Sequence, residues 1–228
     1  MVVLNLTTQT ATNFSTTAAT NGSPRIGAEM VYISGLGTEG ILIVIGGASG
    51  SPGSLSLSSM SEILIFDVNT VFSETSETGW YTQQTTGDSP EPRIDFCAVV
   101  QSAPDNSSFN IYIYGGRDPI SNSYYDQIWI LSLPSFTWIH GYTGDSPRFG
   151  HTCHAVGNRQ MITIGGLLQS NYSTTSCDWE YMGVAILEMS NLCVLFLLQI
   201  LHSCSALLCS NMHTVMQNTT ISPRHISF

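Results

Sequence analysis

The segment DSPEPRIDFCAVVQSAPDNSSFNIYIYGG (88–116) contains a Ser-Pro turn, an arginine, apolar runs rich in β-branched and aromatic residues, and a glycine pair, in that order. The same order recurs in NGSPRIGAEMVYISGLGTEGILIVIGG (21–47) and in DSPRFGHTCHAVGNRQMITIGG (145–166). Self-similarity of this kind indicates a repeat architecture, in which each unit stacks on the next. The three segments therefore predict three copies of one structural unit.

The arginine and the glycine pair of each copy hold matched positions. The spacing is 21 residues from Arg25 to Gly46, 22 from Arg93 to Gly115 and 17 from Arg148 to Gly165, and Gly47, Gly116 and Gly166 complete the pairs. A glycine at the end of a strand can take positive φ and lets neighbouring backbone approach closely. We interpret the arginines as side chains that tie loops to neighbouring repeats rather than bind an anion.

A further β-rich run follows every glycine pair. These runs are SEILIFDVNTVF (61–72), YYDQIWILSLPSFTW (124–138) and CDWEYMGVAILEMSNL (177–192). In two copies a tryptophan, Trp80 or Trp138, belongs to a fourth run. Short runs of Ile, Val, Tyr and Phe separated by Gly, Pro, Asn, Asp and Ser are typical of strands joined by turns. Each unit is predicted to form four strands, with the tryptophans as core residues of the outer strand.

The glycine pair, the later tryptophan and the Pro-Arg opening of the next unit resemble the kelch repeat, which forms one blade of a β-propeller. The resemblance implies an all-β fold, a partial kelch propeller of about three four-stranded antiparallel blades plus a half-blade. The predicted division is a half-blade (1–20), two whole blades (21–86 and 87–142) and a blade that lacks its last strand (143–192). The half-blade rests on an alignment of VLNLTTQTA (3–11) with ILSLPSFTW (130–138), which places Ala11 at the tryptophan position.

Because a propeller blade packs against both of its neighbours, an arc of about three blades leaves two blade faces exposed. We therefore expect this chain to be a fragment of a larger propeller, or to self-associate through those faces.

The pattern breaks after Leu192, where the chain becomes rich in Leu and Cys and contains no glycine. We predict a divergent apolar tail without propeller structure over 193–228. Three interpretations stay open: a transmembrane helix over 192–208, a helix that caps the open propeller, or translated non-coding or frame-shifted sequence. The abrupt change inside a repeat favours the third interpretation. The apolar stretch is short for a transmembrane helix and is interrupted by polar residues.

Composition narrows the class of protein. The net charge is −10 and all six basic residues are arginine, so clustered positive charge for binding nucleic acid is absent from the sequence. Low charge with abundant Ser, Thr, Asn and Gly favours an extracellular or cell-surface protein, with a cytoplasmic location as the alternative, since the first residues lack a signal-peptide pattern. Asn-x-Ser/Thr glycosylation sequons favour the extracellular location. The candidates are Asn5, Asn13, Asn106 and Asn171; further sequons begin at Asn218 and at Asn21, and Pro24 weakens the one at Asn21.

Three potential metal ligands, His151, Cys153 and His154, lie within four positions. Strand alternation places the first two on one face and His154 on the other. The other repeats carry Phe96 and Ala28 where His151 stands, so we interpret the cluster as structural and predict no metal and no cofactor. The six cysteines show no zinc-binding spacing. A disulfide such as Cys153–Cys177 is one option, but the sequence leaves the pairing open.

The resemblance favours a non-catalytic protein-interaction or scaffold module that binds an unidentified protein partner through loops on one face. The loops after the glycine pairs are the candidates, 48–60, 117–125 and 167–178. Within the second we single out four residues, because arginine and tyrosine are common anchors at interfaces. They are Arg117, Asp118, Tyr124 and Tyr125.

Two alternatives are a galactose oxidase-like copper enzyme and a purely structural ectodomain segment of a protein with a membrane helix further along. The copper alternative needs tyrosines and histidines that converge on the propeller axis and a cysteine linked to a tyrosine. The chain offers Tyr112, Tyr114, Tyr124, Tyr125, Cys97 and His151, but no spacing that assembles them.

Overall fold

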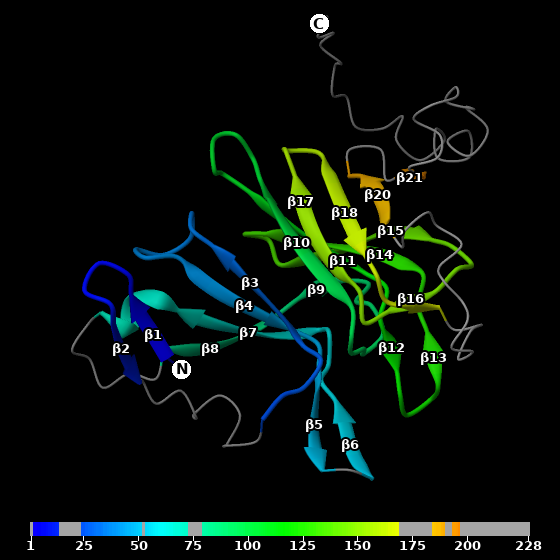
Figure 1. Cartoon of the computed structure of the whole chain (residues 1–228), viewed down its shortest axis with the longest axis horizontal. Helices are drawn as coiled ribbons and strands as arrows, with labels where there is room; N and C mark the ends of the chain where they lie inside the picture. The colour runs from blue at the N-terminus through cyan, green and yellow to red at the C-terminus, as the bar shows by residue number, and fades with distance from the viewer. Residues whose placement is uncertain are drawn as a thin grey trace, which may run out of the picture.

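The computed structural model describes residues 2–13, 24–51, 53–72, 79–168, 184–189 and 193–196. Regular structure in these residues is β throughout, apart from one 3-10 turn at Val68–Val71. Three antiparallel sheets, each built from strands consecutive along the chain apart from small hairpins, dominate the molecule (Figure 1). The predicted all-β fold is confirmed.

The first sheet contains β3 (Glu29–Ile33), β4 (Ile41–Ile45), β7 (Glu62–Asp67) and β8 (Trp80–Gln84), in that order across the sheet. Each strand is antiparallel to its neighbour. The run ILIVI in β4 is apolar at every position because this strand lies inside the sheet and both of its faces can pack against other apolar groups.

The second sheet contains β10 (Cys97–Ser102), β11 (Phe109–Tyr114), β14 (Gln127–Leu133) and β15 (Thr137–Thr143). A two-residue strand, β9 (Thr86–Gly87), adds to its outer edge in parallel with β15. Since β9 follows directly after the outer strand of the first sheet, the chain attaches the first sheet to the second before it begins the inner strand β10.

The third sheet contains β17 (Thr152–Val156), β18 (Gln160–Ile164), β20 (Val184–Glu188) and β21 (Cys193–Phe196). We expected this sheet to lack its fourth strand, and that expectation was wrong. The first four residues of the supposed tail, CVLF, pair antiparallel with β20. An apolar run with β-branched and aromatic residues can complete a sheet without the tryptophan that marks this strand elsewhere.

The remaining tail lies outside the described residues, and so does most of the segment considered as a membrane or capping helix. Within the described part of the chain, no helix is long and apolar enough to span a bilayer.

A separate hairpin at the amino-terminal end joins β1 (Val2–Asn5) to β2 (Thr10–Asn13). Ala11 stands opposite Leu4 in this hairpin, just as Trp138 stands opposite Leu131 in the second sheet. The hairpin thus has the register of the two outer strands of a blade.

The sheets stack face to face, with the inner strands β3, β10 and β17 following one another (Figure 1). One apolar core lies between the first and second sheets and includes Ile33, Ile43, Ile111 and Leu131. A second core lies between the second and third sheets and includes Tyr112, Ile130, Met161 and Leu187. Each sheet therefore functions as a blade that buries one face against the next.

The outer faces of the first and third blades are exposed. Ile45 is fully buried between the first two blades, whereas Ile164, at the equivalent position before the third glycine pair, is 45% exposed. Leu167 beyond it is 53% exposed. On the first blade, Met30 and Tyr32 point away from the second blade and are 58% and 53% exposed. Apolar area of this kind is an association surface.

We predict that the chain self-associates through the third blade. Replacing Ile164 and Leu167 by serine removes apolar surface without disturbing a buried contact, so the double variant is expected to show a larger monomer fraction in sedimentation velocity at matched concentrations. Ile139→Ser, which changes an equally exposed residue (48%) on β15, is the control and leaves the distribution unchanged. A wild-type chain that stays a monodisperse monomer with a sharp thermal transition contradicts the prediction.

Candidate interaction face and blade seams

Each repeat arginine binds the glycine pair of its own blade. In all three blades the guanidinium Nη1 donates to the carbonyl of the first glycine: Arg25 to Gly46 at 3.2 Å, Arg93 to Gly115 at 3.1 Å and Arg148 to Gly165 at 2.8 Å. These three bonds stay within the blade of each arginine, whereas the positive charge of Arg148 also acts on Asp126 of the second blade. The backbone links neighbouring blades directly. The N–H groups of the second glycines, Gly47 and Gly116, donate to the carbonyls of Arg93 and Arg148 in the following blade at 3.0 and 2.8 Å.

All six paired glycines have positive φ, between 60° and 92°. In the first two pairs, the first glycine also lies against the next blade. A Cβ on Gly46 would lie 2.7 Å from Cε1 of Phe96, and a Cβ on Gly115 would overlap the carbonyl of Arg148 and lie 2.7 Å from Cε1 of His151. At Gly165 no described atom lies within 4 Å of this position. Glycine is required at positions 46 and 115 by the close approach of the next blade as well as by positive φ, and at position 165 by positive φ alone.

Gly115→Ala is predicted to destabilise the chain more than Gly165→Ala. Both substitutions force a side chain into the left-handed region, which costs about 1–2 kcal/mol. Only the first adds overlap with a neighbouring blade, which costs roughly another 1–3 kcal/mol. Urea denaturation of the two variants measures the difference in the free energy of unfolding. Equal losses would mean that the second blade does not pack on the third as described.

Arg93 is the most completely bound of the three arginines. It is fully buried and donates to the carbonyl and the carboxylate of Glu91 and to Oε1 of Gln127, and its guanidinium carbon lies 4.0 Å from the centroid of the Tyr125 ring. Burial lowers the pKa of Arg93 to about 10, and the negative charge of Glu91 opposes that shift. With its donors committed to these acceptors and to Gly115, this guanidinium is a structural element.

The two tryptophans of the outer strands differ. Trp138 is buried, and its Nε1 donates to the carbonyl of Met60 in the preceding blade at 2.8 Å. Trp80 packs on Phe66 with ring centroids 5.0 Å apart, but its buried Nε1 has no acceptor among the described residues. The tryptophan of the second blade therefore bonds directly to the first blade.

The loops after the glycine pairs lie at one end of the sheets. Two of them form hairpins, β5 (Ala48–Ser51) with β6 (Ser54–Leu57), and β12 (Arg117–Asp118) with β13 (Ser123–Tyr124). Both extend in the same direction, at the bottom of Figure 1. We call this end the hairpin face.

In the third blade, the strand β19 (Leu167–Leu168) pairs with β16 (Arg148–Phe149) at the same end. Residues 169–178 of the third loop lie outside the described part of the chain.

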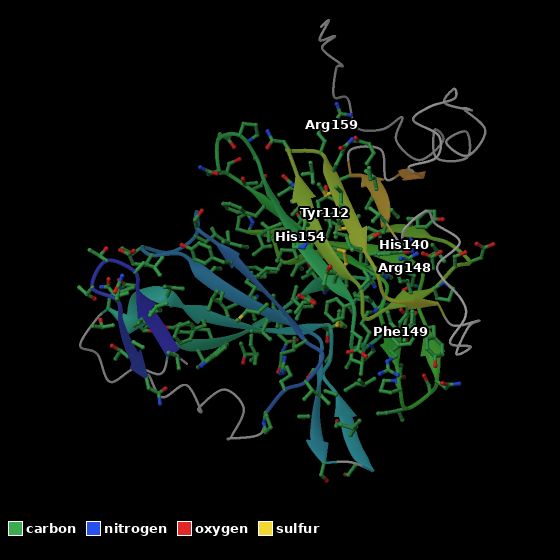
Figure 2. All side chains as sticks on the ribbon, viewed as in Figure 1. Tyr112, His140, Arg148, Phe149, His154 and Arg159 are labelled. Atoms are coloured by element: carbon green, nitrogen blue, oxygen red, sulfur yellow. A yellow bond between two sulfur atoms is a disulfide. The ribbon has the colours of Figure 1, made fainter. Side chains whose placement is uncertain are left out.

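Of the four residues singled out in loop 117–125, Arg117 and Tyr124 contact the third blade, and Tyr125 contacts its own blade. Nε of Arg117 donates to the carboxylate of Asp95 at 2.8 Å, and its guanidinium carbon lies 4.7 Å from the centroid of the Phe149 ring in the third blade. The Tyr124 ring also packs on Phe149, at 5.4 Å between centroids, next to the β12–β13 hairpin (Figure 2). Tyr125 lies against Arg93.

The fourth residue, Asp118, shapes the tip of the hairpin. Its carboxylate accepts hydrogen bonds from the backbone N–H groups of Ile120 and Ser121 and from the Ser121 hydroxyl. These bonds lower the pKa of Asp118, while burial acts in the opposite direction. They also hold Ile120 at the tip, where its side chain is 61% exposed. Sequence reasoning missed Ile120, because only the folded hairpin shows which apolar residue points outward.

A disulfide lies in the interface between the second and third blades, and we call such an interface between blades a seam. Cys97 at the start of β10 is bonded to Cys153 in β17, with Cα atoms 5.6 Å apart. The Cys153–Cys177 option is thereby corrected, since the partner of Cys153 comes from the preceding blade. The sequence could not show this pairing because the two cysteines are 56 residues apart.

His151 lies beside the disulfide and is only 5% exposed. Its ring packs edge-on against Tyr114, 5.1 Å between centroids, and neither ring nitrogen has a hydrogen-bond partner among the described residues. Burial lowers the pKa of His151 to about 3, and the positive charge of Arg148 adds to the shift. The nearby backbone carbonyl of Tyr114 opposes the shift, although its geometry does not meet that of a hydrogen bond to either ring nitrogen. His154, one strand position after Cys153, is exposed, as alternation requires.

Acid is predicted to destabilise the oxidised chain through His151. The pKa of His151 is about 3 in the folded state and about 6.5 in the unfolded state. Between these pH values the unfolded state binds a proton that the folded state does not bind. The free energy of unfolding therefore falls as the pH decreases through this window. Between pH 7 and 5 the loss is about 2 kcal/mol. Chemical denaturation measures it as the difference between wild type and His151→Phe. Parallel pH profiles for the two proteins would contradict it.

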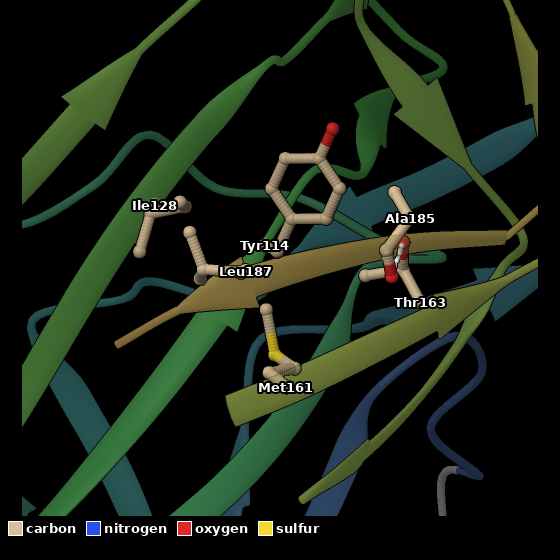
Figure 3. A pocket seen from close by; sticks show the side chains of 6 residues that line it. All are labelled: Tyr114, Ile128, Met161, Thr163, Ala185 and Leu187. Carbon is tan, nitrogen blue, oxygen red and sulfur yellow. Dashed lines mark hydrogen bonds between the residues drawn. The ribbon is translucent and has the colours of Figure 1, made fainter. Parts of the chain in front are cut away.

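One small cavity lies within the described part of the chain. A cavity of about 20 Å³ lies between the second and third blades, lined by Tyr114, Ile128, Met161, Thr163, Ala185 and Leu187 (Figure 3). That volume holds about one water molecule. Of the residues named for the copper alternative, Tyr114 donates through its hydroxyl to the carboxylate of Asp126, and Cys97 is bonded to the sulfur of Cys153.

At the turn that opens the third blade, the N–H of Ser146 donates to the carboxylate of Asp126 in the second blade. The sequon residues Asn5, Asn13 and Asn106 are exposed, whereas Asn171 lies outside the described residues. An exposed asparagine is accessible to modification.

Comparison with known proteins assigns the family. A family model described as the KLHDC2/KLHL20/DRC7 Kelch-repeats domain matches residues 39–192, which is more than half of the chain. The chain belongs to the kelch-repeat family, a domain type associated with protein interactions.

Two curated proteins are similar to this chain over part of their length. A Kelch repeat-containing protein from Arthroderma benhamiae is 36% identical over 170 residues, which is 72% of this chain and 23% of that protein. Host cell factor 2 from Homo sapiens is 29% identical over 109 residues, which is 45% of this chain and 13% of that protein. The chain thus spans less than a quarter of the length of the curated relatives it matches.

Proposed function

We propose that this chain is a non-catalytic protein-binding module that holds a protein partner on its hairpin face. The observation that carries the proposal is the firm attachment of the exposed β12–β13 hairpin at the end of the stacked blades from which the β5–β6 hairpin also extends. The base of β12–β13 is fixed by the Arg117–Asp95 ion pair, by stacking on Phe149 and by the buried Arg93. A loop held in this way loses little conformational entropy on binding, which favours affinity.

The tips of the hairpins are available for contact. Ile120, Ser121 and Asn122 are exposed at the turn of β12–β13, and Gly50, Ser51 and Ser54 are exposed around the turn of β5–β6. Polar, small side chains around one apolar residue match the composition of adaptable binding loops. The small size of the cavity among the described residues supports a surface role over turnover of a small molecule.

We also propose that the chain is part of a larger extracellular or cell-surface propeller. A disulfide between blades is typical of proteins from oxidising compartments. The exposed sequon residues Asn5, Asn13 and Asn106 are compatible with passage through the secretory pathway. The exposed apolar faces of the first and third blades are suited to receive further blades of the same protein.

Ile120→Asp is predicted to reduce partner recovery, because it places a charge at the centre of the proposed contact without touching the hairpin base. The measurement is quantitative affinity capture from an extract of the source cells, with bound proteins compared by mass spectrometry across variants. Ile139→Asp, an exposed isoleucine on the outer strand β15, is the matched control. Arg117→Ala is a further variant, which weakens the base of the hairpin and also lowers the stability of the chain. Its partner recovery is therefore compared with its thermal stability.

Two outcomes oppose the proposal. If Ile120→Asp and wild type recover the same partners in the same amounts, the β12–β13 tip does not bind them. If Ile139→Asp abolishes recovery while Ile120→Asp does not, the outer strands form the binding surface instead of the hairpin face.

A further inference from the structure

Cys97, His151 and Cys153 bring three metal-ligating atoms together at the seam between the second and third blades. The two sulfur atoms and a ring nitrogen of His151 all lie within 4.8 Å of one another. Cys97 comes from β10 of the second blade, whereas His151 and Cys153 come from the start of the third. Ligands contributed by two blades would join them when bound to one ion.

His151 supplies the observation that points to a ligand. Its side chain is 95% buried, since only 5% is exposed, and both ring nitrogens lack hydrogen-bond partners among the described residues. Buried polar atoms are almost always hydrogen-bonded, and each exception needs an explanation. The equivalent positions carry Phe96, which is fully buried and apolar, and Ala28, so packing at this position does not require an imidazole.

We propose that, when the Cys97–Cys153 disulfide is reduced, the two thiolates and the His151 imidazole form a site for one Zn²⁺ ion that clamps the second blade to the third. Two thiolates with one imidazole are a ligand set that zinc prefers, with a fourth position for water. Ligand atoms in a tetrahedral zinc site lie about 3.5–3.8 Å apart, as follows from the bond lengths. The three atoms now lie within 4.8 Å of one another, so zinc binding requires the sulfur atoms to separate and the side chains to adjust into this range.

Reduction of the disulfide precedes zinc binding. A dithiol reductant transfers two electrons and two protons to the disulfide, the sulfur–sulfur bond breaks, and the reductant closes to its own disulfide. Zn²⁺ then displaces the two thiol protons as the sulfur atoms coordinate. The seam is held covalently in the oxidised state and by the ion in the reduced state. Cys153 is only partly buried, so reductant and metal can approach from its side.

The test uses the full chain with the other four cysteines, Cys177, Cys193, Cys204 and Cys209, replaced by serine. After reduction with a dithiol, removal of the reductant and dialysis against Zn²⁺, the protein is expected to retain one zinc per chain. Titration against a chromophoric chelator gives the affinity. Co²⁺ in place of zinc is expected to produce thiolate charge-transfer absorption together with the ligand-field bands of a tetrahedral ion.

His151→Phe is the decisive variant, because it restores the aromatic residue that the second blade carries at this position and removes one ligand. It is expected to fold and to bind zinc at least about tenfold more weakly. His154→Phe, which changes the exposed histidine of the same strand, is the matched control and keeps the wild-type affinity. The oxidised protein is expected to bind no zinc at this site.

Three results would overturn the proposal. They are the absence of stoichiometric zinc in the reduced protein, equal zinc affinity in His151→Phe and the parent, and a cobalt spectrum without thiolate absorption. None depends on a protein partner, so the proposal stands or fails separately from the binding function. Circular dichroism of each variant shows that the β-sheets are retained.

Discussion

The structure depends on a hydrogen-bond relay that crosses every seam through an arginine and a glycine pair. The arginine side chain donates to the carbonyl of the first glycine in its own blade, and the arginine carbonyl accepts the N–H of the second glycine in the preceding blade. Both glycines need positive φ, and the first also has no room for a side chain where a following blade is present. Side chain and backbone together satisfy groups that burial between blades would otherwise leave unpaired.

A second relay runs beside the first, two residues after each arginine. The N–H of Asp95 donates to the carbonyl of Gly27, and the N–H of Gly150 donates to the carbonyl of Asp95. All three residues have positive φ, and only the middle one is not glycine. Aspartate tolerates this conformation better than most residues. Here its carboxylate also binds Arg117, which connects the relay to the base of the hairpin that we propose as a binding loop.

The position after these residues shows how a repeat accommodates variation. Ala28, Phe96 and His151 occupy it in successive blades, and the last two pack beneath the first glycine of the preceding blade. The position requires a side chain that fills the seam, and an imidazole satisfies that requirement as well as a phenyl ring does. A single blade of a repeat protein can therefore carry a polar group at a core position. Here the group is the His151 imidazole, which lies next to a disulfide and whose ring nitrogens are unpaired among the described residues.

Much of the fold could be predicted from the sequence, because the repeat signal is local. Arginine, strand and glycine pair recur at short spacing, and the conformational demands of glycine and the alternation of strands follow from the residues themselves. The pairing of Cys97 with Cys153, the roles of Arg117 and Tyr125, the exposure of Ile120 and the strand Cys193–Phe196 were decided by the tertiary structure. Each of these depends on which blade packs against which, and contacts between residues far apart in the sequence leave no local pattern to read.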